Sequence, residues 1–273
     1  MADGRFAPSP TGDLHLGNLR TALLAWLFAR SAGSRFLMRL EDLDSGRVRP
    51  EFEERQLTDL AAIGLDWDGP VVRQSERIPL YEDALAQLER DGLVYPCYCT
   101  RREIREAASA PHGVAVEGSY PGTCRDLTAA ERAAREAAGR PPALRLRAGG
   151  AVDDFVLRRN EGAFAYNLAV IVDDAEQGIE QVVRGADLAD STPRQVHLAK
   201  LLGLREPTYV HVPLMLGPDG SRLAKRHGAV TLADRDDSPA EVLSEIAASA
   251  GLCEPGEPVT PALLVERFDP AKL

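Results

Sequence analysis

Residues 4–33, GRFAPSPTGDLHLGNLRTALLAWLFARSAG, decide the fold of this 273-residue chain. They predict a short strand over Arg5–Ala7, a loop rich in proline and glycine over Pro8–Gly17, and then a helix. The helix is predicted because apolar residues recur at the spacing of one helix face. These residues are Leu19, Leu23, Trp26 and Leu27. A strand, a loop and a helix in this order are typical of an α/β fold.

The start of this helix is a candidate phosphate site. We expect Asn18 to be the N-cap and Gly33 to follow the last turn. A glycine-containing loop that leads into a helix lets an anion approach free backbone N–H groups, and the helix dipole favours its charge. His15 adds a donor at the same place. The alternative is an ordinary surface turn with an incidental histidine.

A second predicted strand, residues 35–40, makes the first unit a parallel strand–helix–strand crossover. In parallel sheets, ligands bind beyond the carboxyl ends of the strands. The loop 8–17 and the acidic segment 41–44 (Glu-Asp-Leu-Asp) should therefore face one crevice. A carboxylate there could bind an ammonium group or, through a metal ion, a phosphate. Acidic residues at strand ends also often serve only to form turns.

The composition is that of an ordinary globular protein, with 44% hydrophobic and 27% charged residues. The net charge of −10 argues against nonspecific nucleic-acid binding, although local arginine clusters could still form a basic groove. No apolar run reaches the roughly 20 residues that span a bilayer. The N-terminus lacks the pattern of a secretory signal, so we expect a cytoplasmic protein with no membrane partner.

The rest of the chain contains further helix and strand signals. Helices are predicted over residues 51–64 and 77–91 and after the caps Thr128, Ser191, Ser238 and Thr260. Strands are predicted over residues 144–147, 155–159, 163–172, 182–184 and 209–215. The apolar run 163–172, AFAYNLAVIV, is assigned to a buried strand.

Three of the four cysteines, Cys97, Cys99 and Cys124, fall within 28 residues. Disulfides are rare inside cells, and thiolates in this arrangement are typical of a structural zinc site with four ligands. Buried thiols without metal are the alternative. Chemistry alone leaves the fourth ligand open, because His112 is the commoner ligand type and Tyr120 lies four residues before Cys124.

Taken together, these segments resemble the class I aminoacyl-tRNA synthetases of the glutamyl type. Residues 5–18 resemble the HIGH signature of that family, and residues 39–44 (Arg-Leu-Glu-Asp-Leu-Asp) resemble its RxEDxD strand end. Residues 222–226 (Arg-Leu-Ala-Lys-Arg) occupy the place of the KMSKS loop. Tyr166-Asn167 and residues 184–188 resemble the strands of its amino-acid pocket.

The resemblance covers roughly residues 4–250 and implies a Rossmann-like core of parallel sheet with an inserted α+β zinc-containing subdomain. The implied domains are residues 1–95 and 161–235 as the two halves of the core, 96–160 as the insertion, and 236–273 as a short helical extension. Two places depart from the family pattern. Arg222 and Ala224 replace a lysine and a serine of KMSKS, and Asn18 replaces the second histidine of HIGH.

The resemblance also implies the reaction and its residues. The α-carboxylate of glutamate would attack the α-phosphorus of ATP to give glutamyl-adenylate and pyrophosphate, with Mg²⁺ on the ATP phosphates. Such a displacement depends mainly on alignment of the two substrates and neutralisation of the phosphate charge. The implied catalytic residues are His15 and Lys225. The implied glutamate-binding residues are Arg5, Ala7, Ser9, Glu41, Tyr166 and Arg184, and the implied ATP-binding residues are His15, Gly17, Asn18, Arg222 and Lys225.

Two features place the chain within this family. The residues after Lys225 are too few for the helical anticodon-binding domain of the full synthetases, and the cysteine cluster resembles the zinc site of the branch that glutamylates queuosine. Tyrosine is the fourth ligand in that branch, which favours Tyr120 over His112. The implied acceptor is then the queuosine at the first anticodon position of the tRNA(Asp) anticodon stem-loop, and the implied state is a monomer. The alternatives are a truncated synthetase that charges tRNA(Glu) and a non-catalytic zinc-containing remnant that binds nucleotide or RNA.

Overall fold

The structure, a computed structural model, describes residues 2–108, 120–217, 220, 223 and 231–272. It divides into two compact units. The first unit comprises Met1–Glu76, Gln177–Ala189 and Pro207–Leu273, and the second comprises Arg77–Glu176 and Asp190–Glu206. The domain boundaries predicted from the sequence stay predictions. No helix in the described part of the chain is long and apolar enough to cross a membrane.

A parallel sheet of five strands forms the centre of the first unit, in the order β3-β2-β1-β7-β8. The strands are β1 (Gly4–Phe6), β2 (Phe36–Leu40), β3 (Val72–Arg73), β7 (Gln181–Gly185) and β8 (Thr208–Val212). Strands β2 and β3 follow on one side of β1, and the later strands β7 and β8 follow on its other side. The strand order therefore reverses beside β1, which is where ligands bind in such sheets. The predicted α/β fold with a parallel sheet is confirmed.

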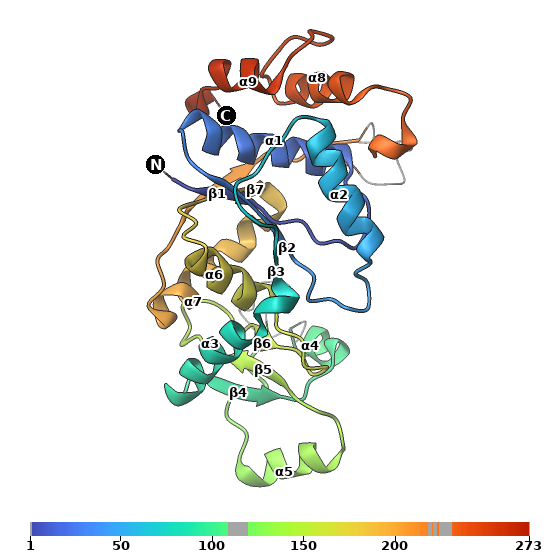
Figure 1. Cartoon of the computed structure of the whole chain (residues 1–273). Helices are drawn as coiled ribbons and strands as arrows, with labels where there is room; N and C mark the ends of the chain where they lie inside the picture. Colours follow the sequence, from blue (N-terminus) through green and yellow to red (C-terminus); the bar gives the residue numbers. More distant parts are fainter. Residues whose placement is uncertain (1, 109–119, 218–219, 221–222, 224–230, 273) are drawn as a thin grey trace. The chain divides into compact units, whose positions relative to one another are not determined.

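Helix α1 (Leu16–Ser31) packs between this sheet and two helices near the C-terminus, α8 (Pro239–Ser249) and α9 (Pro261–Arg267) (Figure 1). It is buried on nearly all sides because it has neighbours on both faces. A side chain at Gly4 would lie 3.4 Å from the Cβ of Ala29, so the missing side chain lets α1 approach β1 closely. Helix α2 (Pro50–Ala62) completes this part of the unit.

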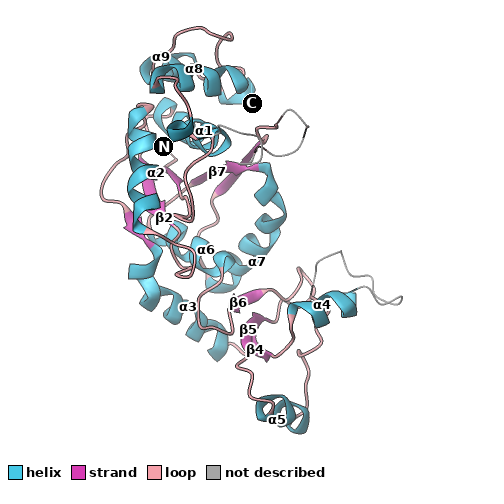
Figure 2. Cartoon of the chain, turned by 90° about the vertical axis from the view of Figure 1, so that its right-hand side faces the viewer, coloured by secondary structure: helices cyan, strands magenta, loops and turns pink. Residues whose placement is uncertain are grey.

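The second unit combines helices with a small antiparallel sheet (Figure 2). The sheet has the order β4-β5-β6, with β4 (Val94–Cys97), β5 (Ala143–Leu146) and β6 (Val156–Arg158). The helices are α3 (Ile78–Arg90), α4 (Arg101–Ala108), α5 (Ala129–Ala137), α6 (Tyr166–Glu176) and α7 (Thr192–Leu202). Within this helical part, the fully buried carboxylate of Asp173 accepts hydrogen bonds from Tyr81 and Arg77.

One predicted strand is wrong. Residues 163–172, assigned to a buried strand, mostly belong to helix α6. All residues from Leu168 to Asp174 are buried, so no exposed face interrupts the apolar run. A helix that is apolar on all sides has no period of 3.6 in its sequence, and a short run of this kind cannot be distinguished from a buried strand.

Candidate functional site

His15, and not Asn18, is the N-cap of helix α1. The His15 Nδ1 atom accepts a hydrogen bond from the backbone N–H of Asn18, and the Asn18 Oδ1 atom accepts one from the backbone N–H of His15, both at 3.2 Å. This reciprocal arrangement is a capping box with histidine in the usual place of serine or threonine. The prediction of Asn18 as N-cap is therefore wrong. The sequence did not indicate His15, because histidine is not among the common capping residues.

The capping bond determines what the His15 ring can offer to a ligand. Because Nδ1 accepts a hydrogen bond, the proton of the neutral ring is on Nε2, which is then a donor. Gly17 leaves space for the ring, since a Cβ atom at this position would lie only 3.0 Å from two ring atoms of His15. The motif therefore places an oriented N–H donor at the positive end of a helix dipole.

Helix α2 anchors the loop that carries His15. The Gln56 Nε2 atom donates to the carbonyl oxygens of Ser9 (3.0 Å) and Gly12 (2.6 Å), and Gln56 is only 1% exposed. Arg55 binds the Asp13 carboxylate through Nε at 2.6 Å. Sequence reasoning missed Gln56, because its partners are more than 40 positions away and no local pattern marks a glutamine as a loop anchor.

The acidic segment after β2 adjoins the same loop, as expected for parallel neighbours. The backbone N–H of Glu41 donates to the Pro8 carbonyl oxygen at 2.9 Å. Arg39 is fully buried, with NH1 donating to Gln177 at 2.8 Å and NH2 lying 3.8 Å from the Glu41 carboxylate. The carboxylate of Glu41 is thus held beside the loop by a buried cation.

Arg5 and Arg184 are the two buried arginines among the predicted glutamate-binding residues, at 4% exposure each. Arg184 lies on β7, and its guanidinium carbon is 4.8 Å from the centre of the Tyr209 ring. Its Nε atom donates to the His211 Nε2 atom at 3.3 Å. Ala7 and Ser9 follow β1 in the same unit. Tyr166 is the first residue of α6 and belongs to the second unit.

Sequence reasoning also missed His211. It is the register partner of Arg184 in the parallel pair of β7 and β8, and its ring is stacked with that of Tyr209. Burial and the adjacent Arg184 cation lower the pKa of His211 below its ordinary value. Both strands were predicted, but the register between them, which brings the two side chains together, cannot be read from either strand alone.

Arg222 and Lys225 lie outside the described residues, so their predicted roles stay predictions. Two residues that flank this segment are described. The backbone N–H of Leu223 donates to the Met215 carbonyl oxygen at 2.9 Å, and Thr231 forms an antiparallel bridge with His15 itself. Leu223 is buried in the same apolar cluster as Leu16. The two described residues on either side of residues 224–230, Leu223 and Thr231, thus both belong to the surroundings of the start of α1.

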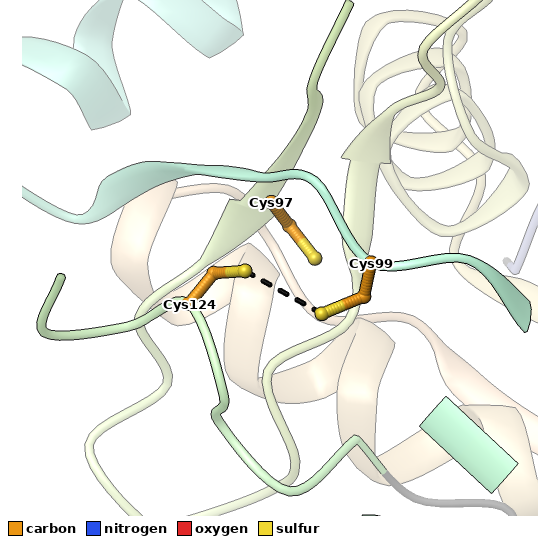
Figure 3. Close-up of side chains that lie close together, drawn as sticks. All are labelled: Cys97, Cys99 and Cys124. Carbon is orange, nitrogen blue, oxygen red and sulfur yellow. Dashed lines mark hydrogen bonds between the residues drawn. The ribbon is translucent and has the colours of Figure 1, made fainter. Parts of the chain in front are cut away.

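The second candidate site is the cysteine cluster. The sulfur atoms of Cys97, Cys99 and Cys124 all lie within 4.8 Å of one another, and Figure 3 shows them pointing toward one point. The Tyr120 hydroxyl oxygen lies 3.4 Å from the Cys97 sulfur and 3.8 Å from the Cys99 sulfur, and the sulfurs of Cys99 and Cys124 are 3.4 Å apart. His112, the other candidate ligand, lies outside the described residues.

Arg145 on β5 adds positive charge to this cluster. Its guanidinium carbon lies 3.8 Å from the centre of the Tyr120 ring. Burial disfavours the Cys97 thiolate, but hydrogen bonds from Tyr120 and the Cys99 backbone, together with Arg145, hold the pKa of Cys97 below its usual value. Burial and the neighbouring sulfurs raise the pKa of Cys99 to about 12.

Comparison with known proteins relates the chain to one family. The family described as tRNA synthetases class I (E and Q), catalytic domain, matches residues 2–151 and 149–257. The Glutamyl-Q tRNA(Asp) synthetase of Nocardia farcinica is 61% identical over 288 residues, which cover 99% of this chain and 90% of that protein. The protein of the same name from Symbiobacterium thermophilum is 52% identical, with coverage of 100% and 94%.

A solved structure shares the fold of the chain. The glutamate-tRNA synthetase of Elizabethkingia anophelis superposes with a TM-score of 0.81 at 28% identity, over 98% of this chain and 66% of that protein. The family match spans most of the sequence, and the two relatives named above exceed half identity over nearly its whole length. The chain belongs to the class I (E and Q) tRNA synthetase family.

Proposed function

We propose that this chain is a ligase that activates L-glutamate with ATP and transfers it to the queuosine of tRNA(Asp). The observation that carries the proposal is the 61% identity, over 99% of the chain, to a Glutamyl-Q tRNA(Asp) synthetase. The site at the start of α1 fits the first step, because it offers the N–H donors that an ATP phosphate requires. Mg²⁺ would accompany the ATP phosphates, as in other phosphoryl-transfer sites.

In the first step, the α-carboxylate of glutamate attacks the α-phosphorus of ATP and pyrophosphate leaves. Such a displacement needs alignment and neutralisation of charge more than a protein nucleophile. We assign the His15 Nε2–H group and the start of α1, with Gly17 and Asn18, to the triphosphate. Lys225 and Arg222 would supply cations to it. One well-placed donor of this kind is worth about 3 kcal/mol in the transition state.

Selection of glutamate would rest on paired charges. Arg184 and Arg5 are our candidates for the carboxylate groups, because a guanidinium can donate two parallel hydrogen bonds to a carboxylate. Glu41 would bind the ammonium group, and Ala7 and Ser9 would complete this side of the pocket. Tyr166 stays our candidate for a further hydrogen bond to glutamate. Glutamine would be rejected strongly, since its uncharged amide would leave a buried arginine without a counter-charge.

The cysteine cluster fits a structural zinc ion held by Cys97, Cys99, Cys124 and Tyr120. In a tetrahedral site with Zn–S bonds of about 2.3 Å, two sulfur ligands lie roughly 3.8 Å apart. The three S···S and S···O distances of 3.4, 3.4 and 3.8 Å are close to this value. Zinc would tie the chain around Cys124 to the end of β4 and so stabilise this part of the second unit.

The first prediction concerns activation. Because the cap of α1 and the contacts around it form within the chain alone, exchange of pyrophosphate into ATP should require glutamate but no tRNA. His15→Ala and Lys225→Ala should each slow the exchange on the order of 100-fold through loss of one charge-stabilising group. Gly17→Ala should slow it as well by displacing the His15 ring. An exchange that depends strictly on tRNA would contradict this prediction.

The second prediction concerns pH. A base whose pKa is lowered by folding contributes stability above its unfolded pKa, and that contribution is lost as the pH falls through the folded value. Below the ordinary histidine value of 6.5, protonation of His211 would remove its acceptor and place a second cation beside Arg184. The KM for glutamate should therefore rise on acidification while the KM for ATP changes little. Steady-state exchange kinetics across this pH range measure both constants.

His211→Gln is the matched variant for this prediction, because an amide oxygen accepts a hydrogen bond but does not titrate. Its KM for glutamate should be close to the neutral-pH value of the unmodified protein throughout. In the described part of the chain, the groups that face His211 include Arg184 from β7 and the Tyr209 ring on its own strand. An unchanged pH profile in His211→Gln would show that another group is responsible.

The third prediction concerns the metal. Protein purified without chelator should contain about one zinc per chain, and Cys97→Ser should lose both the metal and thermal stability. Elemental analysis and thermal melts measure the two effects. Tyr120→Phe should bind zinc more weakly than the unmodified protein, whereas His112→Ala should not. The reverse result for these two variants would assign the fourth position to His112, and absence of metal would refute the site.

The fourth prediction identifies the acceptor. Bases of an anticodon loop can be splayed out and bound individually, and a hydroxyl of the queuosine cyclopentene diol can act as the nucleophile toward the adenylate. Labelled glutamate should therefore appear on tRNA(Asp) that carries queuosine, with the ester on the diol and none on the 3′ adenosine. An excised anticodon stem-loop with queuosine should also accept glutamate, although it lacks the 3′ end altogether.

The matched control is tRNA(Asp) from cells that make no queuosine, which should accept nothing. Periodate oxidation of the diol, with the 3′ end protected, should likewise abolish acceptance. Efficient charging of tRNA(Glu) would instead identify a synthetase for the 3′ end. Absence of any pyrophosphate exchange would leave a non-catalytic zinc-containing protein.

A further inference from the structure

Arg145 is buried, and no carboxylate among the described residues pairs with it. It is 7% exposed and lies in the middle of the antiparallel sheet of the second unit, opposite Tyr95 in β4. Its NH1 atom donates to the main-chain carbonyl oxygen of Asp154 at 2.7 Å, and its guanidinium also interacts with the sulfur of Cys97, while its Nε atom is buried without an acceptor among the described residues. No ion pair with a carboxylate is formed by Arg145 in the described part of the chain.

The carboxylate of Asp154, the residue whose carbonyl oxygen Arg145 binds, already has other hydrogen-bond donors. The side chain of Asp154 accepts hydrogen bonds from Tyr95 and Arg125 at 2.6 Å each and from the backbone N–H of Ala148 at 2.9 Å. Arg145 reaches only the carbonyl oxygen of that residue. A buried guanidinium without a carboxylate partner is costly, because the free energy of removing a charge from water is offset chiefly by a nearby opposite charge. Another anion near Arg145 would offset this cost.

The cysteine cluster can provide that anion. The Arg145 guanidinium stacks on the ring of Tyr120, with its carbon 3.8 Å from the ring centre, and it is an electrostatic neighbour of Cys97. Three thiolates around one Zn²⁺ carry more negative than positive charge, and a phenolate ligand would add to the excess. A zinc ion bound here would form an anionic centre beside a buried cation that has no carboxylate partner in the described part of the chain.

We propose that Arg145 is the counter-ion of the zinc centre and that the two depend on each other for burial in the second unit. This inference rests on the zinc site proposed above. Groups that contact metal ligands without binding the metal typically change metal affinity about 10- to 100-fold when removed. We expect removal of the Arg145 charge to change zinc affinity by a factor in this range. The stacked contact should keep the guanidinium beside Tyr120.

The test is the zinc affinity of Arg145→Met, which preserves length and removes charge. Competition with a chromophoric chelator should show zinc binding weakened at least about tenfold. Arg145→Lys, which keeps a cation, should stay within about threefold of the unmodified protein. The matched control is Arg147→Met, because Arg147 also stacks on a tyrosine, Tyr95, but pairs with the exposed Asp126, and no cysteine is among its contacts in the described part of the chain. Its zinc affinity should be unchanged.

Thermal melts with and without chelator separate this role from a purely structural one. Arg145→Met should lower the melting temperature of the zinc-loaded protein but not that of the chelated protein, in which the buried cation has lost its counter-charge. Equal losses in both forms with unchanged zinc affinity would overturn the proposal. So would an Arg145→Lys variant whose zinc affinity falls by about tenfold or more, a result that also decides the matter if Arg145→Met fails to fold. Absence of zinc from the unmodified protein would refute the zinc site itself.

Discussion

The reciprocal hydrogen bonds between His15 and Asn18 are the constraint on which the first unit depends. They start helix α1 at the place where the strand order of the sheet reverses beside β1. The same ring is then used twice. Its Nδ1 atom accepts a hydrogen bond from a backbone N–H that the first turn of a helix leaves without a partner, and this bond leaves the Nε2 atom of the neutral ring as the donor. The same pair of hydrogen bonds therefore stabilises the start of the helix and orients the His15 ring.

The contacts around this cap come from distant parts of the chain. Gln56 holds two carbonyls of the preceding loop, Glu41 is joined to Pro8 through its backbone, and Thr231 pairs with His15. None of these contacts is local, and each limits the movement of a loop rich in proline and glycine. Such restraint matters for a displacement reaction, since small errors in alignment cost large factors in rate.

Local signals in the sequence were enough to predict much of the fold. The capping boxes at Thr128 and Ser238, the parallel β1-α1-β2 unit and the cysteine cluster were all visible as short patterns. The failures have a common cause. Helix α6 is buried on all sides, so its sequence lacks the alternation of apolar and polar residues that would identify a helix. His211 meets Arg184 only through strand register, and Gln56 acts only through partners far away in sequence.

The division of the chain into units has a consequence for how the protein can be made. Each unit is assembled from separate segments, and β1 has β2 as one neighbour and the much later β7 as the other. On the ribosome, β1 and β2 can pair early, but one edge of β1 stays open until β7 has been synthesised and α1 lacks α8 as a cover until later still. Long-range pairing of this kind folds slowly and exposes strand edges and apolar helix faces meanwhile. Neither unit can be cut out as one continuous fragment, so the nascent chain depends on staying soluble until its second half arrives.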